Sequence, residues 1–220
     1  MKPADKCSFV TRERIFDANL IIAVSSESKQ YICVELCYAL SKYLQMLMLT
    51  IRPSRDDDIP FITAIYNYYV LYSTSTFETI PPTADEMASR RDDVLKKNLP
   101  YLIAEDDNSI VGYAYCTWFK PRAAYRYAVE LSIYFDKDVC SKGFGRQLLN
   151  ALLEEARLVG VRKMIGVIGD SANNRSINLL RAAGFSHVAT LKSYGWKFNR
   201  WLDVILMDKS IGEGDATAPE

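Results

Sequence analysis

The spacing of apolar and polar residues changes character near residue 48. Before that point the longest apolar stretch runs from Tyr31 to Leu49, and charged and polar side chains interrupt it, which favours a docked amphipathic helix over a membrane span. After it, short β-type runs alternate with helical periodicity. We therefore predict an N-terminal extension at 1–47, one domain at 48–211 and a polar tail at 212–220. Residues 1–47 are either a genuine extension or the product of an upstream start.

The first half of the domain contains the pattern of a strand, two helices and a hairpin. Apolar residues at helical spacing indicate the first helix, and the capping box Thr83-Ala84-Asp85-Glu86 begins the second. Two β-rich runs flank Asp106-Asp107-Asn108-Ser109, a turn sequence typical of an antiparallel hairpin. The predicted helices span 59–69 and 83–95, and the predicted strands span 49–51, 101–105 and 110–118.

The second half continues with strands and helices in alternation. A strand at 127–135 carries one carboxylate, Glu130, among largely apolar neighbours. Gly143 and Gly145 begin a helix with one apolar face, and Gly160 ends it. The remaining predictions are strands at 163–168, 185–191 and 201–207 and a helix at 173–183. The order β-α-α-β-β-β-α-β-α-β-β predicts a mixed α/β sheet in a single domain.

Composition narrows the class of protein. The formal net charge is zero, so there is no basic footprint for nucleic acid. Five cysteines without framework spacing favour a reducing, cytoplasmic compartment, and no export or import signal is present. The single histidine, His187, has no cysteine pair beside it, so we predict no metal site and interpret His187 as structural. We expect no nucleic-acid or membrane partner.

The motif Gly143-Phe144-Gly145-Arg146 lies between a strand and an amphipathic helix. Its glycines let the backbone approach a ligand, and the amide groups of the first helical turn suit a pyrophosphate. A dinucleotide fingerprint would need a third glycine where Leu148 stands, and the Gly-Lys-Ser/Thr of a P-loop is absent. Two interpretations remain at this point: a coenzyme A pyrophosphate site, or a tight turn without a ligand.

Several further segments decide between them. Together they resemble the GNAT family of N-acetyltransferases, specifically its phosphinothricin and methionine sulfoximine acetyltransferase branch, from about Met48 to Lys209. The segments that carry the resemblance are Ile51-Arg52-Pro53, Ile65-Tyr66-Asn67, residues 73–78 (STSTFE), residues 122–126 (RAAYR), residues 129–134 (VELSIY), residues 169–173 (GDSAN), Gly184-Phe185, Gly195-Trp196-Lys197, Trp201 and Asp203.

The resemblance implies a GNAT acyl-CoA N-acyltransferase fold, with a mixed, mostly antiparallel central sheet flanked by helices. It implies acetyl-CoA as co-substrate, a small amino acid or analogue as acceptor, direct attack by the amine, and a homodimer. No acyl-enzyme is needed, so Cys116 and Cys140 need not be nucleophiles. Two alternatives stay open: a non-catalytic acyl-CoA-binding module, and an acetyltransferase of protein N-termini or lysines.

Residue roles follow from the residues and the resemblance together. A carboxylate between Val129 and Leu131 should be desolvated, which raises its proton affinity and suits Glu130 to act as the general base. The guanidinium groups of Arg122 and Arg126 suit a substrate carboxylate or phosphinate. The full sets are: for coenzyme binding, Ile133, Tyr134, Phe135, Lys142, Gly143, Phe144, Gly145, Arg146, Asn173 and Ser176; for substrate binding, Phe77, Arg122, Arg126 and Lys197.

Three departures from the family pattern involve four positions. Cys140 replaces the side chain that usually begins the glycine motif, while the glycines themselves are present. Leu180 stands where this branch commonly has a histidine and many relatives a tyrosine, and leucine cannot donate a proton to the departing thiolate. Phe198 and Leu202 replace histidines of some members, so recognition near the C-terminal strand is more apolar.

Overall fold

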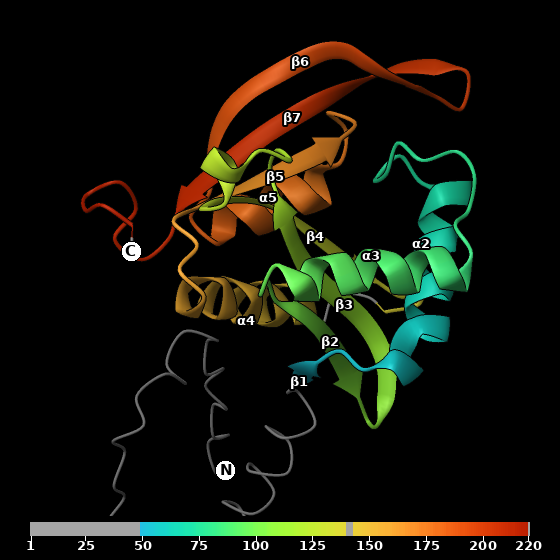
Figure 1. The fold of residues 1–220 in the computed structure, drawn as a ribbon. Helices are drawn as coiled ribbons and strands as arrows, with labels where there is room; N and C mark the ends of the chain where they lie inside the picture. The colour runs from blue at the N-terminus through green and yellow to red at the C-terminus, as the bar shows by residue number, and fades with distance from the viewer. Residues whose placement is uncertain (1–48, 140–142, 220) are drawn as a thin grey trace, which may run out of the picture. The chain divides into compact units, whose positions relative to one another are not determined.

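The computed structural model describes residues 49–139 and 143–219. The predicted extension at 1–47 lies outside them. In the described part of the chain, strands and helices follow the predicted order (Figure 1). The strands are β1 (Thr50–Pro53), β2 (Tyr101–Asp106), β3 (Ser109–Trp118), β4 (Ala128–Phe135), β5 (Lys163–Gly169), β6 (Ser186–Lys197) and β7 (Arg200–Ser210). The helices are α2 (Ile59–Tyr72), α3 (Ala84–Lys96), α4 (Phe144–Leu158) and α5 (Asn174–Ala182), with 3-10 turns η1 (Asp56–Asp58) and η2 (Ala123–Tyr125).

The described strands form one seven-stranded sheet in the order β1-β2-β3-β4-β5-β7-β6. Strands β4 and β5 run parallel, and the other neighbouring pairs are antiparallel. This confirms the predicted mixed, mostly antiparallel sheet. Helix α4 connects the two parallel strands, as a crossover between parallel strands requires.

The parallel pair is short, and this shapes the molecule. The register between β4 and β5 begins at Ala128 and Lys163 and ends at Leu131 and Gly166. Beyond that point β4 continues to Phe135 paired only with β3, while β5 continues to Gly169 paired with β7. The facing edges of the two strands therefore separate in the middle of the sheet.

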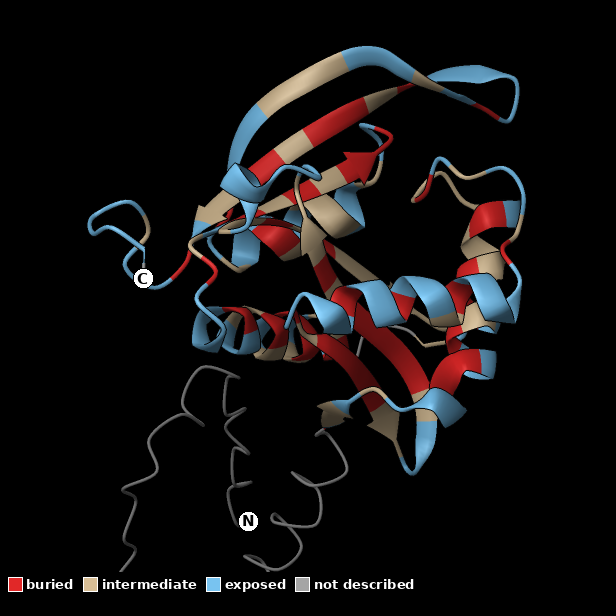
Figure 2. Ribbon diagram, in the orientation of Figure 1, coloured by how far each residue is buried: buried red, intermediate tan, exposed pale blue. Residues whose placement is uncertain are grey.

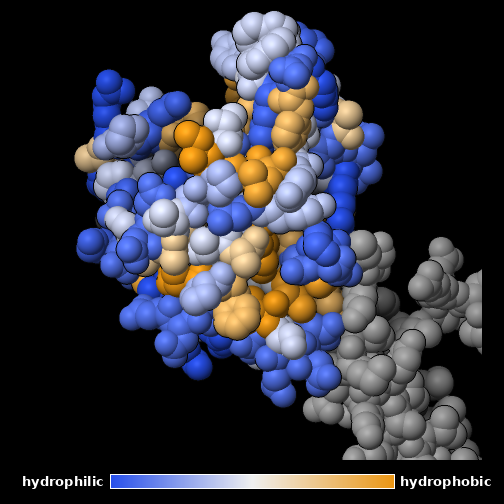
Figure 3. All heavy atoms as spheres, turned by 90° about the vertical axis from the view of Figure 1, so that its right-hand side faces the viewer, coloured by the Kyte–Doolittle hydropathy of each residue, from blue (hydrophilic) through white to orange (hydrophobic). Residues whose placement is uncertain are grey.

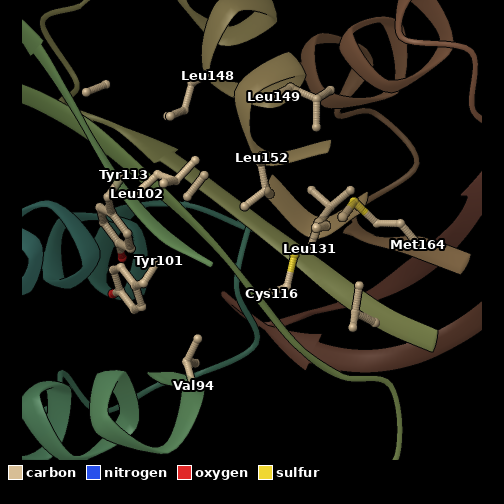
Figure 4. Close-up of a cluster of buried hydrophobic side chains, with 14 of the residues drawn as sticks. Val94, Tyr101, Leu102, Tyr113, Cys116, Leu131, Leu148, Leu149, Leu152 and Met164 are labelled. Carbon is tan, nitrogen blue, oxygen red and sulfur yellow. The ribbon is translucent and has the colours of Figure 1, made fainter. Parts of the chain in front are cut away.

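The core lies on both sides of the central strands. Leu148, Leu149 and Leu152 of α4 pack on one side and Val94 of α3 on the other (Figure 4). These four side chains are at most 2% exposed. The buried residues are concentrated in β2, β3 and the inward sides of α2 and α4, whereas β6 is mostly intermediate or exposed (Figure 2). Burial of this kind stabilises by roughly 25 cal/mol per Å² of apolar surface.

Local sequence explains most element boundaries. The predicted capping box is present: the Thr83 hydroxyl accepts from the Glu86 amide, and the Glu86 carboxylate accepts from the Thr83 amide. In the β2–β3 hairpin, Asp107 and Asn108 both have positive φ, as the predicted tight turn needs.

The C-terminal hairpin is longer than the sequence predicts. Strand β6 extends to Lys197 and β7 begins at Arg200, beyond the expected strands at 185–191 and 201–207. Two register shifts interrupt β6, one of them between Leu191 and Gly195. They break the alternation of apolar and polar residues by which a strand is predicted from sequence. The long hairpin brings Lys197 to the loop after α2, where its Nζ donates to Ser73 O and Thr76 O.

Candidate active site

A cavity of about 460 Å³ lies at the place where β4 and β5 separate. Residues 131–135 of β4 form one wall and residues 166–169 of β5 the other. The start of α5 and the loop after α2 complete it. Beyond Leu131, β4 has no partner strand on this side, so its edge there is open to an extended ligand. The Phe135 carbonyl is an exception, because it accepts from the Tyr69 hydroxyl group at 2.8 Å.

Glu130 lines the cavity, one residue before the strands separate. Burial raises the pKa of its carboxyl group, and the positive charge of Lys120 offsets this only in part. Within the described residues, no side chain donates a hydrogen bond to this carboxylate. A desolvated, unpaired carboxylate that faces a cavity suits proton abstraction.

Tyrosines line the same end of the cavity as Glu130. The Tyr66 hydroxyl group bonds to Thr76 Oγ1 at 3.0 Å and donates to Glu78 Oε1 at 2.9 Å. Burial raises the pKa of Tyr66 to about 12 and also raises that of Tyr115. Both phenols therefore remain protonated at neutral pH, and they line the cavity together with the Glu130 carboxylate.

A smaller hollow of about 210 Å³ lies at the start of α4. It is lined by residues 143–146, Phe135, Val139, Arg175 and Leu179, and it shares Phe135, Arg175 and Leu179 with the large cavity. Gly143 is the N-cap of α4 with φ of 76°, a left-handed conformation that favours glycine. The first backbone hydrogen bonds of the helix are donated by Arg146 and Gln147, so the turn before them faces the hollow with the positive end of the helix dipole.

The two hollows form one path that runs from the helix terminus to Glu130. The path has a helix N-terminus at one end, an unpaired strand edge along its length and a desolvated base at the other end. Such a path suits a long thioester that carries phosphates. The amino-acid sequence matches the acetyltransferase (GNAT) domain family over residues 51–206. The chain belongs to this family.

Similar proteins agree with this membership. The chain is 45% identical over 171 residues, 78% of its own length and 87% of the relative's, to phosphinothricin N-acetyltransferase of Alcaligenes faecalis. It is 35% identical over 163 residues, 74% of this chain and 94% of the other, to L-methionine sulfoximine/L-methionine sulfone acetyltransferase of Pseudomonas aeruginosa. The crystal structure of a GNAT superfamily phosphinothricin acetyltransferase from Sinorhizobium meliloti in complex with AcCoA superposes with a TM-score of 0.76 at 40% identity, covering 78% of this chain and 93% of that one. The predicted family, fold class and acetyltransferase activity are confirmed.

The residues predicted for coenzyme binding come together around this GNAT path. Ile133, Tyr134 and Phe135 line the large cavity on β4, and Asn173 and Ser176 line it at the start of α5. The Asn173 carboxamide oxygen accepts from the Ser176 amide at 3.2 Å, so it also caps the helix. The remaining members, Gly143, Phe144, Gly145 and Arg146, line the smaller hollow, and Lys142 lies outside the described residues.

The residues predicted for substrate binding do not come together. Phe77 lines the same cavity as Glu130. Arg122 and Arg126 flank η2, are exposed and are not part of the cavity wall. Lys197 is buried, and its ammonium group is held by backbone carbonyl groups rather than facing the cavity. Sequence spacing cannot reveal this, because it carries no information on where a long side chain ends.

Sequence reasoning also missed several cavity residues. Tyr66, Tyr69 and Tyr115 line the cavity, and so does Arg175 at the start of α5. The tyrosines lie within apolar helical or strand patterns, so the sequence marks them only as core. Arg175 is adjacent to the predicted Ser176, which was the one available signal.

The structure gives the surroundings of Leu180, which departs from the family pattern, and of Cys116 and His187, to which the sequence assigns no catalytic role. Leu180 lines the cavity and is 3% exposed, and it fills the space above Gly166, where an added Cβ would lie 2.3 Å from Leu180 Cδ1. Cys116 is fully buried, and burial raises the pKa of its thiol, so it is not an activated nucleophile. His187 is exposed on β6 and pairs with Thr190 Oγ1 at 3.0 Å.

No helix in the described part of the chain has the length and apolarity to cross a membrane. In residues 49–139 and 143–219, no group of three or more histidine, cysteine, aspartate or glutamate side chains is placed to hold a metal ion.

Proposed function

We propose that this GNAT protein transfers the acetyl group of acetyl-CoA to the amino group of a small α-amino acid or amino-acid analogue of the phosphinothricin or methionine sulfoximine kind. The observation that carries the proposal is the separation of β4 from β5 directly beside Glu130. This geometry offers an unpaired backbone edge to one substrate and a base to the other. The names of the similar proteins support the acceptor class.

The main chain holds the coenzyme in this proposal. The amide groups of the turn at Gly143–Arg146 and the dipole of α4 would bind the diphosphate. The unpaired edge at Ile133–Phe135 would bind the pantetheine arm as an added strand, and Asn173 and Ser176 would contact it from α5. A backbone amide of β4 would donate to the thioester oxygen, where negative charge develops during acyl transfer.

The chemistry needs one base. The Glu130 carboxylate accepts a proton from the acceptor's ammonium group, through a water molecule, and releases the amine lone pair. A C–N bond then forms at the thioester carbonyl carbon and the C–S bond breaks. The sulfur leaves as a thiolate, and the nitrogen gives its second proton to water, which leaves the neutral acetamide. No covalent acyl-enzyme forms, which agrees with the protonated, buried state of Cys116.

The thiolate leaves without help from position 180. Leu180 has no donor group, and it lines the cavity where the coenzyme would lie. A thiol has an ordinary pKa of about 8.5, so its anion is an acceptable leaving group in water. We propose that water protonates the sulfur after it departs, which makes this step slower than in relatives that have a donor here.

Phe77, Arg122, Arg126 and Lys197 are the proposed determinants of the acceptor, and they differ in their position relative to the cavity. Phe77 supports the proposal because it is part of the same cavity lining as Glu130. Arg122 and Arg126 lie beyond the wall of the cavity and would reach only an acceptor that extends out of it.

The test of this function combines binding and turnover. Titration calorimetry with acetyl-CoA should give a saturable heat. Incubation of acetyl-CoA with phosphinothricin, methionine sulfoximine or methionine sulfone should release free thiol in proportion to N-acetylated product. No heat on titration of the folded protein would reject the coenzyme, and binding without product from any of the three amines would reject the acceptor class.

We also propose that the protein is a homodimer and works in the cytoplasm. Large apolar side chains are exposed on α2 and on the β6–β7 hairpin, among them Phe61, Tyr72, Trp196 and Trp201. Figure 3 shows the face on the right-hand side of Figure 1, where hydrophobic residues gather among hydrophilic ones. Large apolar side chains exposed on one face favour association. Light scattering of the purified chain measures the oligomeric state directly.

A further inference from the structure

Lys197, the last residue of β6, has a buried ammonium group with a complete set of backbone partners. The residue is 4% exposed. Its Nζ donates to Ser73 O at 2.7 Å, to Thr76 O at 2.8 Å and to Tyr69 O at 3.4 Å. Burial lowers the pKa of this group. A buried charge is costly unless it is hydrogen-bonded, so these contacts bind the loop after α2 to the C-terminal hairpin.

Two further contacts join the same loop to the C-terminal half of the sheet. The Phe77 ring lies against Gly195, where an added Cβ would be 1.9 Å from Phe77 Cε1. The Thr74 hydroxyl group donates to Asp170 Oδ2 at 3.2 Å, and Arg200 binds the same carboxylate oxygen. Burial alone would raise the pKa of Asp170, but hydrogen bonds from the Ala172 amide, Arg200 and Thr74 outweigh it and lower that pKa. The loop 73–78 is therefore fixed at three points.

This loop forms one end of the active-site cavity. Ser75, Thr76 and Phe77 line the large cavity, and none of the residues 73–78 lines the smaller hollow at the start of α4. Thr76 Oγ1 bonds to the Tyr66 hydroxyl group, so its position also sets the hydroxyl groups near Glu130. A displacement of the loop would change the acceptor end and leave the coenzyme end in place.

We propose that Lys197 is a positioning residue for the acceptor: its ammonium group fixes the loop 73–78 so that Thr76 and Phe77 shape the acceptor end of the cavity. Lys197 does this without touching the acceptor, because its ammonium hydrogens are directed at three carbonyl oxygens. The expected change in KM rests on the proposed function, whereas the fixing of the loop 73–78 by Lys197 does not. It replaces direct substrate contact as the role of Lys197.

The test compares Lys197→Met with Lys192→Met. Methionine keeps the length of the side chain and removes the donors. Lys192 lies on the same strand, but its side chain is 75% exposed and pairs with Asp203 at the surface. Misplacing groups that orient a substrate by about 1 Å costs on the order of 100-fold in rate. We expect Lys197→Met to raise the KM for methionine sulfoximine about 10-fold or more, and the Kd for acetyl-CoA from calorimetry to change less than about twofold.

Hydrogen exchange of the backbone amides provides a readout that needs no turnover. Lys197→Met should accelerate exchange in peptides that cover 73–78 about 10-fold or more, because their local opening is no longer opposed by the ammonium contacts. Lys192→Met should change neither exchange nor KM. If the protein acetylates none of the amines, the proposed function fails, while exchange in 73–78 still tests the role of Lys197.

Other outcomes would overturn the proposal. Unchanged exchange in 73–78 would show that Lys197 does not fix the loop. A rise in KM that disappears when the acceptor's carboxylate is replaced by a carboxamide would show that Lys197 binds the acceptor directly, since a positioning effect persists with both acceptors. If Lys197→Met does not fold, as judged by its melting transition and by the heat of acetyl-CoA binding, Lys197→Gln, which keeps an amide donor, undergoes the same measurements with smaller effects expected.

Discussion

The two ends of the cavity are built in different ways. The coenzyme end consists mostly of main chain: the free edge of β4 after Leu131 and the turn at Gly143–Arg146. The acceptor end consists of side chains from distant segments, with Tyr66, Phe77 and Glu130 brought together from α2, the following loop and β4. Main-chain groups do not depend on the side chain, so the coenzyme end should tolerate substitutions that keep the backbone conformation. Each side chain at the acceptor end, by contrast, is a separate determinant of specificity.

The difference also explains how departures from the family pattern can coexist with the fold. Leu180 changes a side chain at the wall of the cavity but leaves the strand edges unaltered. At the acceptor end the geometry depends on buried contacts such as those of Lys197. We therefore expect changes near the coenzyme to alter affinity moderately and changes near the acceptor to alter turnover and selectivity.

The largest effect is expected for Glu130→Gln. General base catalysis contributes roughly 10²- to 10⁴-fold, so kcat should fall by about that factor. Glutamine keeps the shape of the side chain but cannot act as a base at neutral pH. Because the coenzyme is held elsewhere, the Kd for acetyl-CoA should stay within about twofold of the parent value. Initial rates and calorimetry on the same preparation measure both. Equal turnover by parent and variant would exclude Glu130 as the base.

The pH dependence of turnover should report the environment of Glu130. Only the carboxylate accepts a proton, and burial raises its pKa, so activity is present above that raised pKa and is lost as the pH falls through it. Below it, kcat should fall about 10-fold per pH unit, with the midpoint above the ordinary glutamate value of about 4.3. A rate profile from pH 4 to 8 locates the midpoint. A midpoint at or below the ordinary value would contradict a desolvated base.

Gly143→Ala tests whether the coenzyme end depends on backbone conformation. Gly143 has φ of 76° with open space where a Cβ would lie, so alanine adds only left-handed strain of about 1–2 kcal/mol. Relief of that strain would turn the amide groups of the helix terminus, and the Kd for acetyl-CoA should rise about 10-fold while the KM for the amine stays the same. Gly160→Ala is the matched control, since Gly160 has φ of 83° and equal space but ends the same helix away from the cavity. Similar affinity loss in both variants would indicate general destabilisation.

Phe77→Ala should affect the opposite substrate. The ring lines the same cavity as Glu130 and lies against Gly195, and its removal enlarges the acceptor end. We expect the KM for methionine sulfoximine to rise several-fold, about 1 kcal/mol of lost contact, with the Kd for acetyl-CoA unchanged. For amino acids with larger side chains, the KM should rise less than it does for the acceptor that the parent protein prefers. A loss confined to acetyl-CoA binding would show that Phe77 belongs to the coenzyme end of the cavity and not to the acceptor end.

The smallest effects are expected for Arg122→Gln and Arg126→Gln. Both side chains are exposed outside the cavity wall, and Arg126 stacks on the Tyr127 ring with 4.3 Å between its guanidinium carbon and the ring centroid. Surface charges of this kind contribute little to affinity, so each variant should change the KM for the amine by less than about twofold. Steady-state rates with a carboxylate acceptor check this. A rise of 10-fold or more in either variant would extend the acceptor site beyond the cavity to η2.

Local signals in the sequence were sufficient for much of the fold. The capping box at Thr83 and the turn at Asp107-Asn108 are complete within a few residues, so propensity and local hydrogen bonding determine them. The hairpin turn at Phe198-Asn199 also has two residues with positive φ, yet the sequence did not reveal it. The register shift between Leu191 and Gly195 interrupts the alternation before that turn, and phenylalanine is not a typical turn residue.

The amino-acid sequence by itself determined the order of elements, the glycine turn before α4 and the position of Glu130 on a largely apolar strand. Each of these depends on neighbours in the chain or on a local pattern. Only the tertiary structure decided which side chains share a cavity. It placed Tyr66 in the same cavity as Glu130 and left Arg122 outside. It also directed the Lys197 ammonium group at carbonyl groups that lie 121 to 128 residues earlier in the chain. The physical reason is that a long side chain is placed by packing and by the hydrogen bonds that its buried end requires, and those partners come from parts of the chain that no local pattern connects.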